Sequence, residues 1–497
     1  MRIGLPRRRM LRALIYFVCL VLVLLAVDMI MIQMRRTIHP GFDTTRIIEP
    51  RLPDGRIDYL AAIEDHFGQS VTAQNNAAPL VLEALGRAAL PHNQPADGIT
   101  DRLGMPHLAE RGDYLVSYEA FRTLHKAEAQ DPDGAYRSLQ TPWPATPPPL
   151  TAAWIAANEK PLAKIEDATK LPRFFMPFNG GPGVLMVVQI PLTYLTPLRY
   201  AAVALCTRAM LREQAGDFEG CRRDLLATHR LARLIAQQPS LVECLVAGGI
   251  ERLACRTERG AAASGKLTAA QARLLAGDLA SMPDLPPWAQ NVDSFERYNA
   301  LDLMQECAHV GPVRTVEILN LISDQHMPAQ LVRWVPVPYE ESMRALNRAY
   351  DRLTRAANEP TYARQAAALR LSQDELATFK PRNPVTALLS PNWWLTILFP
   401  SLTNCQQSVE AVRMENRLSQ VALALAAYKA EHGGYPKRLE ALAPAYLAAV
   451  PLDLFVDKPL VYAAAAKGYT LYSVGPNMID DGGKSAKPCD DIVASVP

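Results

Sequence analysis

The sequence lacks the short motifs that mark the commonest catalytic sites. It contains no HExxH zinc motif, no GxSxG nucleophile turn, no P-loop and no GxGxxG dinucleotide turn, and its nine histidines are scattered without ligand spacing. These absences favour a protein without enzymatic activity. A hydrolase site built from residues far apart in the sequence stays open, and a pocket with clustered acids and a raised carboxylate pKa would indicate one.

A surplus of charge of one sign is also missing. The chain has 52 lysines and arginines against 50 aspartates and glutamates, a net charge of +2, and no long basic tract follows residue 36. There is thus no general attraction to nucleic acid, and we expect no nucleic-acid partner. The length of 497 residues and the hydrophobic content of 49% allow at least one large core and favour two to four domains.

Cysteines with metal or redox spacing are missing as well. None of the eight cysteines forms a CxxC pair, so neither a zinc site nor a thioredoxin-type pair is indicated. Cys244 and Cys255 lie about 16 Å apart along one expected helix, which is too far for a disulfide. We expect most of the cysteines to be buried as small apolar residues. Cys405 and Cys489 form the pair most suited to a disulfide, because both lie in one C-terminal unit.

What the sequence does have is a long apolar run near its N-terminus. Five arginines within residues 1–12 precede a run from Ala13 to Ile32 that only Asp28 interrupts. About 20 residues at 1.5 Å each match the roughly 30 Å of a bilayer core, which predicts a transmembrane helix at 13–34. The excess of arginine before the run places residues 1–12 in the cytoplasm and the bulk outside. A cleaved signal peptide is the alternative.

The middle of the chain is predicted to be helical. Residues 35–150 alternate short helical stretches with breaks and end in "TPWPATPPPL", an extended linker or strap. Residues 151–400 form a helical domain, whose hairpin around Gly216 and Asp217 resembles a tetratricopeptide-like unit without a second copy at 34 residues. Helices are expected at 151–170, 199–214, 218–238, 241–260, 267–281, 293–308, 340–357 and 361–379.

Single histidines and glutamates of this region have ordinary structural explanations. We expect His229 and His432 to pair with helix surfaces and not to act as catalytic bases. Glu243 and Glu251 lie eight positions apart on one expected helix, where they line a groove or form salt bridges with its arginines. Salt bridges are the simpler interpretation.

The C-terminal unit, residues 401–497, has a different pattern. From Asn404 to Glu431 apolar residues recur at spacings of three and four, which predicts one long helix that ends at Gly433. A short second helix is expected at 437–449. The stretches "KPLVYAA" and "GYTLYSV" then alternate in the manner of a β-hairpin, and the acidic turn "GPNMIDDGG" follows.

This order of segments resembles the periplasmic head of the major pseudopilin of type II secretion. The resemblance covers about 90 residues and implies a small α+β head made of a long helix and a small antiparallel sheet. Three earlier segments are "TAQNNAAPLVLEALG", "AAWIAANEKPLAKIEDATKLPRF" and the hairpin with "HRLARLIAQQPSLVECLV". Their order is similar to that in a set of large, membrane-anchored bacterial proteins with no activity to carry over, which implies a single-pass protein of the bacterial inner membrane. The matching positions are Gly434, Tyr435–Pro436, Leu439–Leu442, Leu447–Asp453, Pro459–Tyr462, Tyr472–Asn477 and Asp490–Ile492.

In that family the closing loop binds calcium, so the resemblance implies a Ca²⁺ site here. A hard cation prefers six to eight oxygens, and adjacent aspartates would repel one another without it. An ion-free polar loop is the alternative, because an asparagine replaces the family's usual aspartate and removes one charge. The residues that would hold the ion are Asn477, Asp480, Asp481, Asp490 and Asp491.

The sequence departs from the family before its apolar run. A pilin-type subunit has a basic leader, a glycine cleavage point and a helix with a glutamate at its fifth position, whereas Gly41-Phe42 lies after the run. We therefore expect the head to be a module and not a polymerising subunit. The predicted protein is mainly α and serves as a cell-envelope scaffold or interaction protein. A component or accessory subunit of a secretion or pilus-like machine is the first alternative, and an envelope hydrolase is the second.

Overall fold

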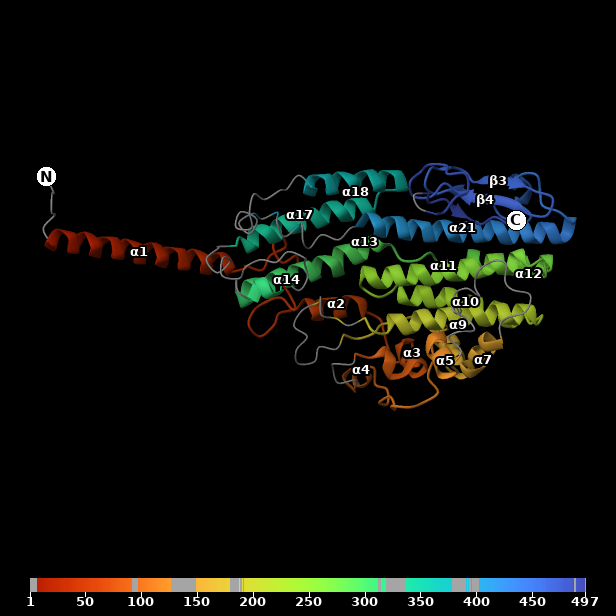
Figure 1. Ribbon diagram of the computed structural model, residues 1–497, viewed down its shortest axis with the longest axis horizontal. Coiled ribbons are helices and arrows are strands. Elements are labelled where there is room, and N and C mark those ends of the chain that lie inside the picture. Colours follow the sequence, from red (N-terminus) through yellow and green to blue (C-terminus); the bar gives the residue numbers. More distant parts are fainter. Residues whose placement is uncertain are drawn as a thin grey trace.

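The computed structural model describes most of the chain and is mainly helical, as predicted (Figure 1). Most of the proline-rich stretch lies outside the described residues. Among the residues whose side chains the structure describes, none of the helices combines the length and the apolar character needed to cross a membrane. The described residues are 7–91, 97–126, 149–178, 187, 190, 192–311, 314–318, 337–377, 390, 392, 395, 402–486 and 489–496.

The first helix, α1 (Arg7–Arg36), projects from the body along the long axis of the molecule (Figure 1). Its last residue is attached to a helix of the body, α14 (Arg297–Val310). The guanidinium of Arg36 donates to the carbonyl of Ala308 at 2.8 Å and to that of His309 at 2.5 Å. These bonds satisfy carbonyls at the C-terminal end of α14, where a positive charge is favourable.

Short helices form the layer below the body in Figure 1. The helix predicted at 151–170 is interrupted at Asn158, whose side chain accepts from the Val116 N–H at 2.8 Å and donates to the Trp154 carbonyl at 2.9 Å. Pro161 follows, and because it has no N–H it cannot continue the ladder of the first helix. The elements are α2 (Tyr59–Phe67), α3 (Ala78–Leu85), η1 (Gly86–Ala89), α4 (Asp97–Arg102), α5 (Tyr118–Leu124), α7 (Pro149–Ala157) and α8 (Glu159–Ala168).

The predicted hairpin is present as α9 (Leu195–Gln214) and α10 (Phe218–Ile235). Gly216 supplies the positive φ of +81° that the turn needs. Asp217 then caps α10 by accepting from the Gly220 N–H at 2.9 Å. Two further predicted helices follow, α11 (Leu241–Ala263) and α12 (Ala269–Ser281), and each begins with a capping box.

The remaining body helices agree with the predicted positions except at one start. The helix expected from 293 begins at Trp288 and contains a π-helical segment, which widens the helix by one residue. The elements are α13 (Trp288–Asn291), η3 (Val292–Glu296), α14, α17 (Tyr339–Ala357) and α18 (Tyr362–Ala377).

The longest element, α21 (Leu402–His432), is the unbroken helix that the sequence predicts. Gly433 ends it with a φ of +75°. In Figure 1 it lies between α11 and α12 on one side and the strands on the other. It contributes side chains to each of the four hydrophobic clusters formed by the described residues, namely Cys405 and Val409, Val412, Met414 and Leu418, and Leu423 and Ala427.

The head packs two small antiparallel sheets on α21. The predicted hairpin is formed by β3 (Val461–Ala464) and β4 (Tyr469–Ser473), with Tyr462 opposite Leu471. A third strand, β5 (Ile492–Val493), pairs with the other side of β4, so the strand order in this sheet is β3-β4-β5. A separate pair joins β1 (Leu452–Asp453) to β2 (Lys458–Pro459).

The prediction of a helix at 437–449 is wrong. Only a single 3₁₀ turn, η4 (Leu439–Leu442), is present. Pro444 disfavours helical backbone at the residue before it, and Ala443 accordingly has the extended values φ −97° and ψ 142°. The chain thus leaves the helix after one turn.

The proposed disulfide is also wrong, because all eight cysteines are free. Cys405 lies in the first turn of α21 and packs in the cluster that contains Cys244, whereas Cys489 lies in the closing loop of the head. The expectation that most cysteines are buried is confirmed, since six of the eight are buried.

Candidate functional site

The residues of the predicted calcium loop lie beside the ends of β4 and β5. Asp490 Oδ2 accepts from the backbone N–H of Asn477 at 3.0 Å, and Asn477 Nδ2 donates to Asp481 Oδ2 at 2.9 Å. Asp491 accepts from the N–H groups of Asp481 at 3.4 Å and Gly483 at 2.7 Å. The loop therefore brings four of the five predicted ligands, Asn477, Asp481, Asp490 and Asp491, into one hydrogen-bonded group.

Asp480, the fifth predicted ligand, has different partners. Its Oδ1 accepts from the hydroxyl of Tyr472 and from the N–H of Gly482, both at 2.9 Å. The residue is exposed, and neither of these bonds joins it to the other acids. Burial and the Asp480 carboxylate together raise the pKa of the Tyr472 hydroxyl to about 12.

One carboxylate oxygen of the loop is available to a hard cation. Asp490 Oδ1 is buried and has no hydrogen-bond partner. Burial raises the pKa of Asp490, and the neighbouring carboxylates of Asp481 and Asp491 raise it further. A cation would supply the missing partner and offset the repulsion between these carboxylates. The donor set therefore fits the calcium that the resemblance implies.

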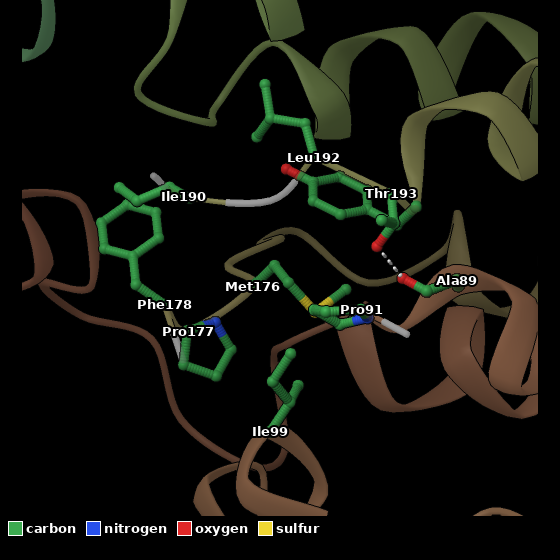
Figure 2. Close-up of a pocket in the computed structure, with 10 residues that line it drawn as sticks. Ala89, Pro91, Ile99, Met176, Pro177, Phe178, Ile190, Leu192 and Thr193 are labelled. Carbon is green, nitrogen blue, oxygen red and sulfur yellow. Dashed lines mark hydrogen bonds between the residues drawn. The ribbon is translucent and has the colours of Figure 1, made fainter. Parts of the chain in front are cut away.

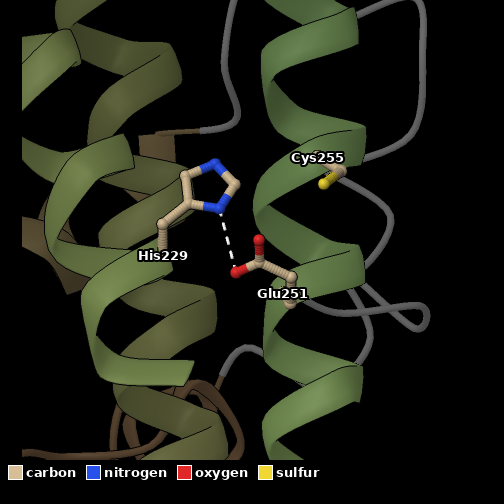
Figure 3. A group of neighbouring side chains, drawn as sticks. All are labelled: His229, Glu251 and Cys255. Carbon is tan, nitrogen blue, oxygen red and sulfur yellow. Dashed lines mark ion pairs between the residues drawn. The ribbon is translucent and has the colours of Figure 1, made fainter. Parts of the chain in front are cut away.

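A second group of ionisable side chains is buried between α10 and α11 (Figure 3). His229 Nδ1 lies 3.0 Å from Glu251 Oε2, and His229 Nε2 lies 3.2 Å from Glu258 Oε1. Arg233 Nη1 lies 2.8 Å from the same oxygen of Glu251. The side chains of His229 and Glu251 are 1% and 0% exposed, so the charges are removed from water.

The group holds two basic and two acidic side chains, and the pKa values of His229 and Glu251 are shifted by their neighbours. Burial alone would lower the pKa of His229, but the carboxylates of Glu251 and Glu258 raise it to about 10. Burial would raise the pKa of Glu251, but the charges of His229 and Arg233 lower it to about 2. His229 is therefore a protonated imidazolium that bridges two carboxylates.

The same group also has the residue types of a metal site. His229, Glu251 and Cys255 each offer one ligand atom, and these atoms lie within 4.8 Å of one another. Metal ligands must be deprotonated, however. Here the imidazole faces carboxylates at both nitrogens, burial raises the pKa of the Cys255 thiol, and that thiol donates to Asn416 Oδ1 at 2.7 Å. The arrangement fits a buried charge network better than a metal centre.

Glu243 is a buried carboxyl with a raised pKa, which is the property expected of a catalytic acid in a hydrolase. Burial raises its pKa to about 8. Its Oε2 accepts from the Ser240 N–H at 2.8 Å as part of the capping box of α11, and its Oε1 accepts from the hydroxyl of Tyr194. Both oxygens thus have structural partners.

A small apolar hollow lies next to Tyr194 (Figure 2). Ile99, Met176 and Phe178 line it, and its space of about 20 Å³ is enough for one water molecule. The hydroxyl of Thr193 at its edge donates to the Ala89 carbonyl at 2.9 Å. A hollow of this size does not hold an organic substrate.

Comparison with protein-family models, with curated proteins and with solved structures finds no match to this chain. The geometry and chemistry of the described residues are therefore the basis for the function.

The buried charges were only partly predictable from the sequence. The prediction that His229 pairs with a helix surface is confirmed. The prediction that Glu243 and Glu251 form salt bridges with arginines of their own helix is wrong, because Glu251 pairs with His229 and Arg233 of α10, and Glu243 accepts from Tyr194 and Ser240. The sequence does not reveal that Glu258 is the second partner of His229. The signal was present in the spacing, because Glu251, Cys255 and Glu258 lie at positions i, i+4 and i+7 and so share one face of α11.

Proposed function

We propose that the protein is a scaffold or interaction protein of the bacterial cell envelope, anchored in the inner membrane by α1. Residues 1–12 lie in the cytoplasm and the bulk of the chain lies in the periplasm. The observation that carries this proposal is the exposure of apolar side chains on α1. The exposed residues are Leu14, Ile15, Tyr16, Phe17, Val18, Leu20, Val21, Leu22, Val23, Leu24, Val27 and Met29.

These side chains surround the helix. The stretch from Leu14 to Leu24 covers about three turns, so its members point in every direction around the axis. A helix that is apolar on all sides requires an apolar environment on all sides. The body leaves these side chains uncovered, and a bilayer supplies the cover that they lack. This argument supports the predicted anchor at 13–34.

The head supports the pseudopilin resemblance by the order of its elements. A long helix, the turn after Gly433, an antiparallel hairpin and a closing acidic loop follow one another in α21, β3, β4 and the segment up to β5. A subunit that polymerised through its long helix would need a free helix face. The two sides of α21 are covered by α11 and α12 and by the sheet, which favours a module over a fibre subunit.

Calcium is part of this proposal. The ion would be held in the closing loop by Asp481, Asp490 and Asp491, with the unpartnered Asp490 Oδ1 as the oxygen that gains most. There it would neutralise the loop and fix its conformation. No chemistry on a substrate is proposed for it.

The anchor is tested by replacing Leu20 and Val21 with arginine in the full chain. Two arginines at the centre of a membrane helix each cost about 2.5 to 3.5 kcal/mol on insertion. We expect the unmodified chain to stay in membrane pellets after alkaline carbonate extraction and the variant to move to the supernatant. A matched control replaces Leu124 and Leu371, two exposed leucines of the body, with arginine. Extraction of the unmodified chain by carbonate would refute the anchor.

The order of the head elements also favours the second candidate, an accessory subunit of a secretion or pilus-like machine. Crosslinking in cells followed by identification of the bound proteins separates the two candidates. Recovery of secretion or pilus components would support the accessory subunit. Recovery of other envelope proteins alone would support the general scaffold.

A further inference from the structure

A hollow of about 180 Å³ opens on the surface between α9 and α11. Arginine side chains and apolar side chains form its walls, and none of the lining residues is acidic. Each of the two helices contributes to both kinds of wall. The lining residues are Arg199, Val203, Gly249, Ile250, Arg252, Leu253 and Arg256.

The three arginines have no carboxylate partners within the part of the chain that the structure describes. Arg252 donates weakly to the Ser408 carbonyl at 3.5 Å, and its Nε is buried without a partner. Arg199 and Arg256 are exposed. Elsewhere in the body a buried arginine is paired, as Arg208 is with Asp224 at 2.7 Å. Three guanidinium groups around one hollow repel one another unless an anion joins them.

The glycine at the floor keeps the hollow open. A Cβ added to Gly249 would meet no atom within 4 Å, whereas one added to the preceding Gly248 would lie 3.0 Å from Val412 Cγ2. Gly248 thus lies at the close contact between α11 and α21, where a Cβ would press on Val412. Gly249 has no such contact, and its missing side chain leaves room that a ligand can use.

The charges select the class of ligand. A carboxylate has one charge and two oxygens, which a single guanidinium satisfies, whereas a phosphate group has up to two charges and several oxygens. Three guanidinium groups therefore match a phosphate better than a carboxylate. Val203, Ile250 and Leu253 would contact a carbon substituent.

We propose that this hollow binds a phosphate group that has an organic substituent, with Arg199, Arg252 and Arg256 on the phosphate. Two sources share this chemistry, a soluble phosphate ester and a phospholipid head group. The site is distant in sequence from α1 and from the acidic loop and does not depend on the proposed anchor or on calcium.

The test is isothermal titration of the full chain in an uncharged detergent with inorganic phosphate, glycerol phosphate and a short-chain phosphatidic acid. We expect glycerol phosphate or phosphatidic acid to bind more tightly than inorganic phosphate, because only they reach the apolar wall. Tighter binding of phosphatidic acid than of glycerol phosphate identifies a lipid, and the reverse order identifies a soluble ester. Absence of binding by all three probes would overturn the proposal.

Two pairs of variants distinguish binding at the hollow from an effect of the overall charge of the protein. Replacing Arg199 and Arg256 with alanine removes two charge-assisted contacts and is expected to weaken binding at least tenfold. Replacing Arg111 and Arg370 with alanine makes the same charge change at exposed positions elsewhere and should leave binding unchanged. An equal loss in both pairs would overturn the site.

A third variant fills the hollow without removing charge. Gly249→Leu places a side chain where the structure has open space, so the chain should fold and binding should be lost. The melting temperature of each variant checks the fold. Tight binding by a folded Gly249→Leu variant would show that the ligand sits elsewhere.

Discussion

At the scale of single residues, the buried charge network around His229 makes stability sensitive to the loss of any one partner. Burying four ionised groups is costly unless each is paired, and removal of one partner leaves the others uncompensated. Glu251 Oε1 and Glu258 Oε2 already lack hydrogen-bond partners, so these two carboxylates depend strongly on the imidazolium between them.

We expect His229→Leu to lower the free energy of unfolding by about 3 to 5 kcal/mol, because it leaves Glu258 as an unpaired buried charge. Urea unfolding of the full chain in detergent measures this loss. The matched control is His432→Leu at an exposed position, where a change within about 0.5 kcal/mol is expected. Equal effects of the two substitutions would show that the network contributes nothing to stability.

The same network predicts a pH dependence. The pKa of His229 is raised to about 10, so its contribution to stability is complete below about pH 6.5, the unfolded value, and is lost as the pH rises through about 10. The pKa of Glu251 is lowered to about 2, so its contribution is complete above about pH 4.5 and is lost as the pH falls through about 2. The destabilisation by His229→Leu should therefore be largest between about pH 4.5 and 6.5 and shrink near pH 10. A difference that is independent of pH up to 10 would contradict the raised pKa.

Asn477 is expected to reduce the dependence of the acidic loop on calcium. Its amide donates to Asp481, so it supplies part of the positive charge that a cation would supply. We expect Asn477→Asp to remove this donor, add a negative charge and make the loop more dependent on calcium. The stabilisation by calcium, measured as the shift of the melting temperature of the full chain, should be larger in Asn477→Asp than in the unmodified chain. Asp54→Asn, far from the loop, is the control, and equal shifts in all three chains would contradict this role.

The acidic loop could be predicted from the sequence better than the charge network around His229. The acidic loop was visible because its residues are close in sequence and follow a recognisable order. The partners of His229 come from another helix, and their distance depends on how α10 and α11 pack. No local pattern fixes which of several glutamates on α11 faces the histidine, so the charge network was only partly predictable.

At the scale of elements, one glycine lies at a close contact between α11 and α21. Gly248 lies against Val412, and Gly249 faces open space. Both are in the interior of a helix, where alanine is favoured over glycine by about 1 kcal/mol. The same substitution, glycine to alanine, can therefore be compared at a packed position, Gly248, and at an open one, Gly249.

We expect Gly249→Ala to stabilise the chain by about 0.5 to 1 kcal/mol, because it gains helix propensity without a clash. Gly248→Ala should gain less, because its Cβ would press on Val412, and Gly248→Val should destabilise by about 1 to 3 kcal/mol. Urea unfolding of the three variants measures the order. Equal stabilisation by both alanines would show that α21 can move away from α11 at no cost.

The elements that were predicted correctly have strong local signals. The long helix α21 and the hairpin of α9 and α10 have regular apolar spacing and clear ends at glycine or aspartate. The errors at 151–170 and 437–449 both lie where a proline sits inside a helical pattern. Pro161 and Pro444 ended or displaced the helix, and the apolar spacing around them did not signal it.

At the scale of the whole molecule, α21 joins the head to the body. The same helix contributes to all four hydrophobic clusters, so neither part can lose it without exposing apolar surface. The boundary predicted at residue 401 therefore separates two sequence patterns that share one helix in the structure.

We expect the head and the body to unfold in one cooperative transition. Hydrogen exchange of the full chain tests this, because amides in β4, α11 and α21 should exchange with the same free energy of opening. Exchange of β4 at a much lower free energy than α11 would show that the head opens independently. The substitution Leu418→Ala, in the contact of α21 with the head, should lower all three values together by about 2 to 5 kcal/mol.

The attachment of α1 through Arg36 has a consequence for where the head is held in a cell. The guanidinium of Arg36 donates to carbonyls at the end of α14, so α1 is attached to the body by hydrogen bonds as well as by the chain. The strands lie at the end of the molecule opposite α1 (Figure 1). A protein mounted on a bilayer by α1 would hold the β3–β4 hairpin far from the lipid, whereas the acidic loop faces α18, because the hydroxyl of Tyr362 donates to the Pro476 carbonyl at 2.9 Å.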